Sequence, residues 1–122
     1  MITIYHLKRD LDRDTRLTVT LPPPGDASAQ IDAARAAFKA GHYEAVATVD
    51  TDDLNLAFKL TQNGVVSPSW TMEPPEGLTP LVQPIKHNGK LYGHRSTDIG
   101  DILMLDNALH MVAPFGFERI GG

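Results

Sequence analysis

The segment of residues 93–101 concentrates more reactive side chains than any other part of the chain. Its sequence, GHRSTDIGD, contains an imidazole, a guanidinium, two hydroxyls and two carboxylates. A small hydrolase could use Ser96 as nucleophile and His94 as its base, with Asp98 or Asp101 orienting the imidazole. Catalytic partners usually come from separate elements of a fold, so closeness in sequence is weak support for such a site.

The same segment also has the composition of a tight turn. Ser, Thr and Asp side chains hydrogen-bond nearby backbone groups, and glycine adopts the backbone conformations that turns require. We therefore expect Ser96 and Thr97 to bond backbone N–H groups and Asp101 to anchor the start of the next strand. On this interpretation, the change Asp101→Ala lowers stability by about 1–2 kcal/mol and abolishes no specific activity.

Three carboxylates lie close together at Asp50, Asp52 and Asp53. Carboxylate oxygens suit Mg²⁺, so a metal site is one interpretation. A helix start is the interpretation we favour, with Thr51 as the N-cap and Asp52 and Asp53 in the first turn, where the helix dipole favours negative charge. A third interpretation is a contact surface for a basic partner.

The residue types that hold cofactors lack the spacing they would need. The chain has no cysteine, and its histidines form no pair four residues apart on a predicted helix. The glycines are scattered and form neither common type of phosphate-binding loop. We therefore expect no cofactor, no metal and no catalytic residue.

Length and composition set the broad class of the protein. The chain has 122 residues, of which 42% are apolar, and this suits one domain with a single core. The net charge of −4 argues against coating nucleic acid by bulk charge. No apolar run approaches the roughly 20 residues that span a bilayer, and the first charges follow the apolar residues, unlike in a secretory signal. We expect a cytoplasmic domain without a membrane partner.

Hydrophobic periodicity predicts the main elements. Alternation predicts strands near residues 2–5 and 17–21, and a run of small and β-branched residues predicts a buried strand over 43–49. Apolar residues at helical spacing predict helices over 27–40 and 52–62. The expected boundaries between the second strand and the first helix are Pro22, Pro23, Pro24 and Gly25 as the stop, and Asp26 or Ser28 as the cap.

Turn signals organise the rest of the chain. Asn88-Gly89 and Asp106-Asn107 each lie between short apolar runs and predict hairpins. Residues 65–84 form an irregular Pro-rich loop containing Trp70, which either pins the loop to the core or is an exposed anchor for a partner. Together these elements predict a single α+β domain, with two helices packed on one face of a mostly antiparallel sheet.

Residues 43–120 resemble small phage and plasmid proteins with an RSTSVGDV-type motif, which is similar to that of YodL-like domains. The run AFKLTQN at 57–63 is similar to their "AF-x-LTN" helix, and Trp70 follows it as in their Trp-containing loop. The run RSTDIGDI at 95–102 matches their motif, with Asp98 where Ser or Thr is expected. The motif residues carried over are Arg95, Ser96, Thr97, Gly100 and Asp101. The resemblance implies a mobile genetic element as the setting rather than a reaction.

Size, charge and this resemblance favour a non-enzymatic protein that binds a host or element protein. An inhibitor of bacterial defence, of the anti-CRISPR or anti-restriction type, is the specific case we consider. Residues 44–76 hold six acids and one base, so the expected contact surface is acidic. The candidate partner-binding residues are Asp50, Asp52, Asp53, Trp70, Glu73 and Glu76.

The alternative is a nucleic-acid-binding regulator of the element. Seven cations gathered on one face could hold a duplex despite the negative total charge. Those cations are Lys8, Arg9, Arg13, Arg16, Lys86, Lys90 and Arg95.

Overall fold

The computed structural model describes residues 1–20 and 27–121, which form three helices and eight strands. The helices are α1 (Arg13–Thr20), α2 (Ala27–Lys39) and α3 (Leu54–Leu60). The strands are β1 (Ile2–Leu7), β2 (Tyr43–Val49), β3 (Leu78–Pro80), β4 (Ile85–His87), β5 (Lys90–Tyr92), β6 (Ile102–Leu105), β7 (Ala108–Val112) and β8 (Phe117–Gly121). The predicted α+β class is confirmed. In the described part of the chain, no helix is long and apolar enough to cross a membrane.

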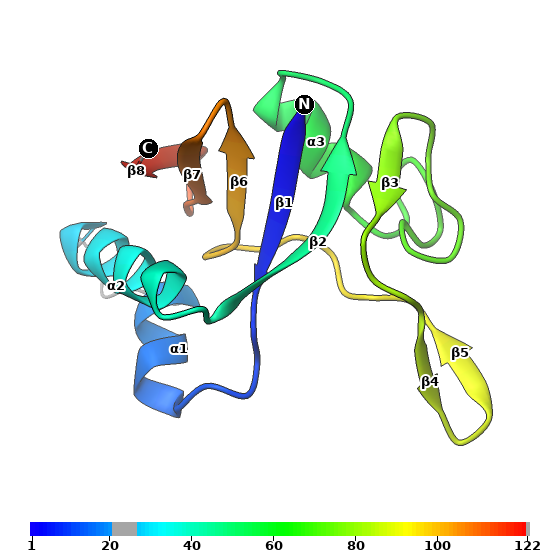
Figure 1. Cartoon of the computed structure of the whole chain (residues 1–122), viewed down its shortest axis with the longest axis horizontal. Coiled ribbons are helices and arrows are strands. Elements are labelled where there is room, and N and C mark those ends of the chain that lie inside the picture. Colours follow the sequence, from blue (N-terminus) through cyan, green and yellow to red (C-terminus); the bar gives the residue numbers. More distant parts are fainter. Residues whose placement is uncertain (21–26, 122) are drawn as a thin grey trace.

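Six strands form one antiparallel sheet in the order β3-β2-β1-β6-β7-β8, and β4 and β5 form a separate hairpin. Figure 1 shows this hairpin projecting from the body at the side opposite to α1 and α2. Both predicted hairpin turns are confirmed. Asn88 and Gly89 join β4 to β5 with φ of 50° and 77°, and Asp106 and Asn107 join β6 to β7 with φ of 50° and 67°. Positive φ at two central residues matches the twist of the flanking strands.

Both faces of the large sheet are covered, which corrects the expectation that the helices pack on one face. Successive side chains along a strand point to opposite faces. Accordingly, Leu103 packs in a core with α3 and Trp70, whereas its neighbour Ile102 packs in a second core with α1 and α2. Met111 and Val112 of β7 divide between the two cores in the same way. The fold therefore has three layers, with the sheet in the middle.

Residues 13–20 form a helix where the sequence predicts a strand over 17–21. The Asp12 carboxylate accepts a hydrogen bond from the Thr15 N–H at 3.0 Å, as an N-cap does. The hydroxyls of Thr18 and Thr20 donate to carbonyls one turn earlier, at 2.8 Å each. The helix therefore gives the hydroxyl groups of these β-branched residues hydrogen-bond partners. Val19 is the residue of α1 that becomes fully buried. The tertiary contact of one apolar side chain therefore outweighs the local β preference.

The two other helices confirm the predictions over 27–40 and 52–62, with shorter bounds. The N-cap of α3 is Asp53 rather than Thr51, because the Asp53 carboxylate accepts from the N–H groups of Asn55 and Leu56. Thr51 instead accepts from the Asp53 N–H at 3.1 Å. The predicted strand end at residues 21–25 and the Asp26 cap lie outside the described residues, and Ser28 lies within α2.

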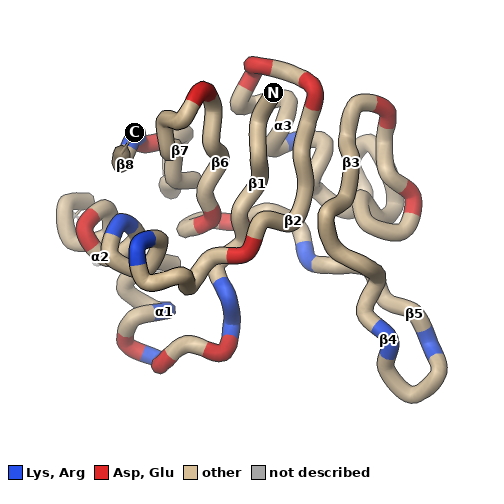
Figure 2. The backbone as a smooth tube through the Cα atoms, in the orientation of Figure 1, with Lys and Arg blue, Asp and Glu red and all other residues tan. Residues whose placement is uncertain are grey.

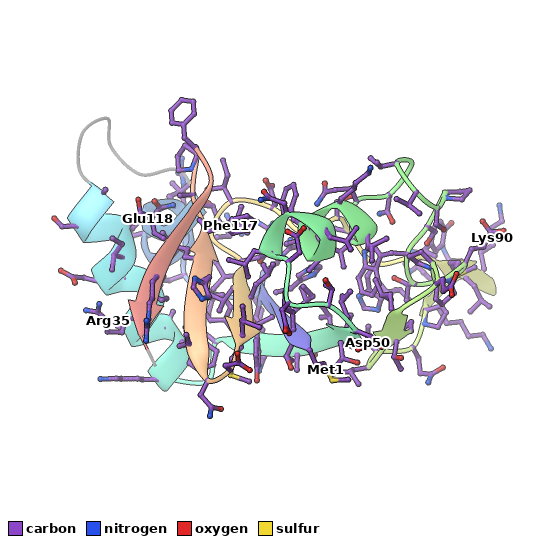
Figure 3. The ribbon with its side chains drawn as sticks, turned by 90° about the horizontal axis from the view of Figure 1, so that it is seen from above. Met1, Arg35, Asp50, Lys90, Phe117 and Glu118 are labelled. Carbon is purple, nitrogen blue, oxygen red and sulfur yellow. The ribbon has the colours of Figure 1, made fainter. Side chains whose placement is uncertain are left out.

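The β8 edge of the sheet is partly covered by α2. An edge strand exposes unpaired backbone groups that can recruit another chain. Arg35 of α2, labelled beside β8 in Figure 3, donates from Nε to the Ile120 carbonyl at 2.7 Å. This side-chain bond satisfies one edge carbonyl and ties α2 to the sheet.

Gly100 allows the 93–101 segment to pass α1 at close range. Its φ is +92°, and a Cβ at this position would lie 2.8 Å from Cγ1 of Val19. We expect Gly100→Ala to lower the free energy of unfolding by about 2–4 kcal/mol, from backbone strain plus overlap. Gly77→Ala is the matched control, because Gly77 has φ +88° but open space around it. Chemical denaturation checks the difference, and equal losses for the two variants would contradict the close contact.

Candidate functional site

The Asp101 carboxylate is the centre of the most densely bonded polar site in the described structure. It is 1% exposed and sits immediately before β6. Its two oxygens accept from Nη1 and Nη2 of Arg95 at 2.6 and 2.8 Å, a two-point contact that fixes the guanidinium. They also accept from the N–H groups of Leu7 and Asp98, at 2.8 Å each. The expectation that Asp101 anchors the next strand is confirmed, and the anchor also reaches the end of β1.

Arg95 has little hydrogen-bonding capacity left for a ligand. Besides Asp101, its Nη1 donates to the Ser96 carbonyl at 3.0 Å and its Nη2 to the Leu7 carbonyl at 3.2 Å. A guanidinium has five N–H donors, and these bonds engage both terminal nitrogens fully. Arg95 therefore joins the 93–101 segment to β1, and its charge is matched by Asp101.

The two hydroxyls of the segment bind different partners. Ser96 Oγ accepts from the backbone N–H of Asn63 at 2.9 Å, as expected. Thr97 was expected to bond a backbone N–H in the same way, and this prediction is wrong. Its Oγ1 lies 2.9 Å from Nε2 of His6, a buried histidine on β1. The histidine reaches Thr97 because β1 runs across the segment, a contact between residues far apart in sequence.

The hydrolase arrangement is not assembled in the structure. Nε2 of His94 lies 2.7 Å from the Gln83 carbonyl oxygen rather than on Ser96. Asp98 is exposed, and its carboxylate accepts from the N–H of the next residue, Ile99, at 2.8 Å. The side chains of Ser96, His94, Asp98 and Asp101 therefore each bind partners outside the expected arrangement.

Trp70 is fully buried and fastens the long loop to the core. Its Nε1 donates to the Arg95 carbonyl at 2.9 Å, and its ring contacts the rings of His6 and His94. The interpretation that Trp70 pins the loop is therefore the one that the structure supports. The prediction that Trp70 binds a partner is wrong, because a side chain with no exposed surface cannot contact another protein.

The acidic end of the molecule consists of Asp50, Asp52, Asp53 and Asp106. Figure 2 shows acidic segments on the loop between β2 and α3 and on the turn between β6 and β7, beside the N-terminus. The Met1 amine donates to Asp52 at 2.8 Å, and its pKa is raised by that bond and by the charges of Asp106 and Asp50. All four carboxylates are exposed, so one amine offsets only part of their charge.

Glu73 and Glu76 are also exposed, on the loop that precedes β3. Figure 2 shows their loop beside β3, and the Asp50 N–H donates to the carbonyl of Gly77, the residue after Glu76, at 2.8 Å. The structure therefore brings Glu76 to the three predicted aspartates, whereas Glu73 bonds Ser67 and Ser69 of its own loop. Within the described residues, no group of three or more His, Asp and Glu side chains is arranged to hold a metal ion.

The seven cations considered for nucleic-acid binding are distributed over four parts of the chain. Lys8 and Arg9 follow β1, Arg13 and Arg16 lie in α1, and Lys86 and Lys90 lie on the projecting hairpin. Arg95 is paired with buried Asp101. Acidic residues are interleaved with the first four cations, namely Asp10, Asp12 and Asp14.

Burial keeps His6 neutral, and this makes the stability of the fold depend on pH. Desolvation lowers the pKa of His6 to about 4, while the Asp101 charge acts in the opposite direction. In the unfolded chain the imidazole titrates near pH 6.5. The unfolded state therefore takes up a proton first as the pH falls, and stability is lost between about pH 6.5 and 4.

We expect His6 to contribute about 3 kcal/mol to the loss of unfolding free energy between pH 7 and 4. Urea denaturation across this range should give a flatter pH profile for His6→Gln than for the unchanged chain. His87→Gln is the control, because His87 is exposed on β4. A profile for His6→Gln parallel to that of the unchanged chain would show that His6 is not held neutral.

Comparison of the chain with protein-family models, with curated proteins and with solved structures finds no match.

Proposed function

We propose that this chain is a non-enzymatic protein of a mobile genetic element that acts by binding a host or element protein. Inhibition of a bacterial defence complex is the specific case that we put forward. The acidic end carries the proposal, because exposed carboxylates from two separate loops meet there. Such a surface is complementary to a basic groove of the kind that binds nucleic acid.

The use of the polar 93–101 segment supports a binding role rather than catalysis. The segment bonds β1 through Arg95, Thr97 and Asp101, and it bonds Asn63 through Ser96. These bonds hold the sheet, the long loop and α3 together. The side chains available to a partner are those on the surface, and the acidic end groups four exposed carboxylates there.

Regulation by nucleic-acid binding is the alternative, and it has less support. Arg95 is engaged by Asp101, and Asp10, Asp12 and Asp14 lie among Lys8, Arg9, Arg13 and Arg16. A duplex on that side would meet carboxylates as well as cations. A gel-shift experiment at about 50 and 200 mM salt decides between the two, since phosphate contacts weaken steeply with salt. We expect no shift at the lower concentration.

The proposal is tested by affinity capture from a bacterial lysate that contains defence complexes, followed by mass spectrometry. The decisive variant carries Asp50→Asn, Glu76→Gln and Asp106→Asn, which removes three charges at or beside the acidic end and leaves the Asp53 cap and the Asp52 pair with Met1 intact. We expect the unchanged chain to retain a partner at low salt and the variant to lose it. Higher salt should also release the partner, because exposed charges are screened within about 10 Å at 0.1 M.

The matched control removes the same amount of charge elsewhere. Asp10→Asn, Asp32→Asn and Glu118→Gln are exposed substitutions outside the acidic end. The control variant should capture the same partner as the unchanged chain. A partner lost equally from both variants would point to net charge alone, and capture of nothing at low salt would contradict the proposal.

A further inference from the structure

A cleft of about 600 Å³ lies on the α3 side of the sheet, where β1 ends. Its floor includes His6 and Val46, and its walls include Lys8 and Arg9 on one side and Ile85 on the projecting hairpin. The volume is within the range of about 300–1,000 Å³ that is usual for small-molecule sites. The cleft is not one of the features singled out from the sequence, because its residues come from β1, β2, β4, the loop after β1 and the 93–101 segment, and meet only in the fold.

The cleft is cationic on one wall. Lys8 and Arg9 are exposed, and neither forms an ion pair with any described residue. Arg9 lies close enough to Arg95 for the two like charges to interact, and burial together with that neighbour lowers the pKa of Arg9. A guanidinium remains charged in proteins, so the wall keeps a positive charge that no described carboxylate pairs with directly.

The floor contributes a ring nitrogen that is able to form a hydrogen bond with a ligand. His6 is 6% exposed and neutral, with Nε2 bonded to the Thr97 hydroxyl. No buried side-chain nitrogen or oxygen in the described residues lacks a partner, so Nδ1, which bonds no described group, keeps some exposed surface, and His6 lines the cleft. The Thr97 hydroxyl can donate to Nε2 or accept from it. When it donates, Nδ1 carries the proton and can itself donate to a ligand.

Two carboxylates, Asp10 and Glu44, also line the cleft. An extended polyanion would lie against them as well as against Lys8 and Arg9. A compact ligand can instead place its anionic group on the cationic wall and offer hydroxyl groups to the carboxylates. The mixture of charges thus favours a small molecule that has both kinds of group.

We propose that this cleft binds a small phosphate monoester that carries hydroxyl groups, such as a nucleotide or a sugar phosphate. Lys8 and Arg9 would hold the phosphate, Nδ1 of His6 would donate to one of its oxygens, and Glu44 would accept from a ligand hydroxyl. Charge-assisted hydrogen bonds from a guanidinium to a phosphate are among the stronger polar contacts in proteins. This site is separate from the acidic end, so its test does not depend on the proposed protein partner.

The experiment is a titration of the ¹⁵N-labelled chain with AMP, inorganic phosphate and a short DNA duplex, followed by amide chemical shifts. We expect saturable shifts for residues 6–9 and 94 with AMP. Arg9→Gln should weaken AMP binding by about tenfold or more, and Arg13→Gln, an exposed arginine outside the cleft, should leave it unchanged. Glu44→Gln should weaken AMP but not inorganic phosphate, since the latter has no ribose hydroxyl to place on this carboxylate.

Three outcomes would overturn the proposal. The first is the absence of saturable shifts with AMP at millimolar concentration. The second is equal weakening by Arg9→Gln and Arg13→Gln, which would mean general attraction of anions. The third is tighter binding of the duplex than of AMP at equal phosphate concentration, which would assign the cations to nucleic acid instead.

Discussion

Replacing Asp101 by alanine should lower the free energy of unfolding by about 3–5 kcal/mol, which is the usual effect of breaking a buried ion pair from one side. The loss exceeds the 1–2 kcal/mol expected from the sequence, because the carboxylate accepts four hydrogen bonds rather than one. Without it, the Leu7 N–H loses its hydrogen bond to the carboxylate and the Arg95 guanidinium loses its counter-ion and two of its hydrogen bonds, and such losses inside a protein are costly.

Urea or thermal denaturation measures this effect, and Asp98→Ala is the matched control. Asp98 is an exposed carboxylate three residues away, and it accepts from the N–H of its own neighbour. We expect the control to cost less than about 1 kcal/mol. Similar losses for the two variants would mean that the hydrogen bonds to Asp101 do not stabilise the fold as the geometry implies.

Replacing Trp70 by alanine should have a comparable effect, about 3–5 kcal/mol. The side chain has no exposed surface and lies in the core between the sheet and α3. Its removal opens a large cavity and deletes the Nε1 bond to the Arg95 carbonyl. The long loop would lose its main attachment, so hydrogen exchange of its amides should accelerate in the variant.

Trp70→Phe separates the two contributions of this residue. Phenylalanine keeps much of the apolar volume but cannot donate to the Arg95 carbonyl. We expect it to cost less than alanine and more than about 1 kcal/mol, because the Arg95 carbonyl loses its donor. If Trp70→Ala were nearly neutral and left the loop amides as protected as before, the loop would be held by other contacts.

Local signals predicted the elements whose stability is mainly local. The turns at Asn88-Gly89 and Asp106-Asn107 lie where the sequence indicates, since these residues tolerate positive φ. The helix over 27–39 and the strand over 43–49 follow from their apolar spacing. The turn before Asp101 also follows from its composition, with Gly100 in the left-handed region.

The features that sequence reasoning missed depend on distant residues. The alternation from Leu17 onward indicates a strand, but these residues form a helix in which Val19 packs against α2 and lies close to Gly100. The local signal for this helix was Asp12, which caps its start. The partners of Thr97 and Asp101 on β1 lie more than 90 residues away in the chain. The hydrophobic periodicity of a sequence cannot predict such contacts. It cannot predict the cleft either, because the cleft is lined by residues of three strands and two loops.

Whether the 93–101 segment serves the fold is tested most directly by a double-mutant cycle on Arg95 and Asp101. The free energies of unfolding of Arg95→Gln, Asp101→Asn and the double variant are compared with that of the unchanged chain. Two short bonds join these side chains, and Asp101 is 1% exposed. We expect a coupling energy of about 2–3 kcal/mol, with the double variant less destabilised than the sum of the single ones. Losses that add to within about 0.5 kcal/mol would contradict a structural role for the pair.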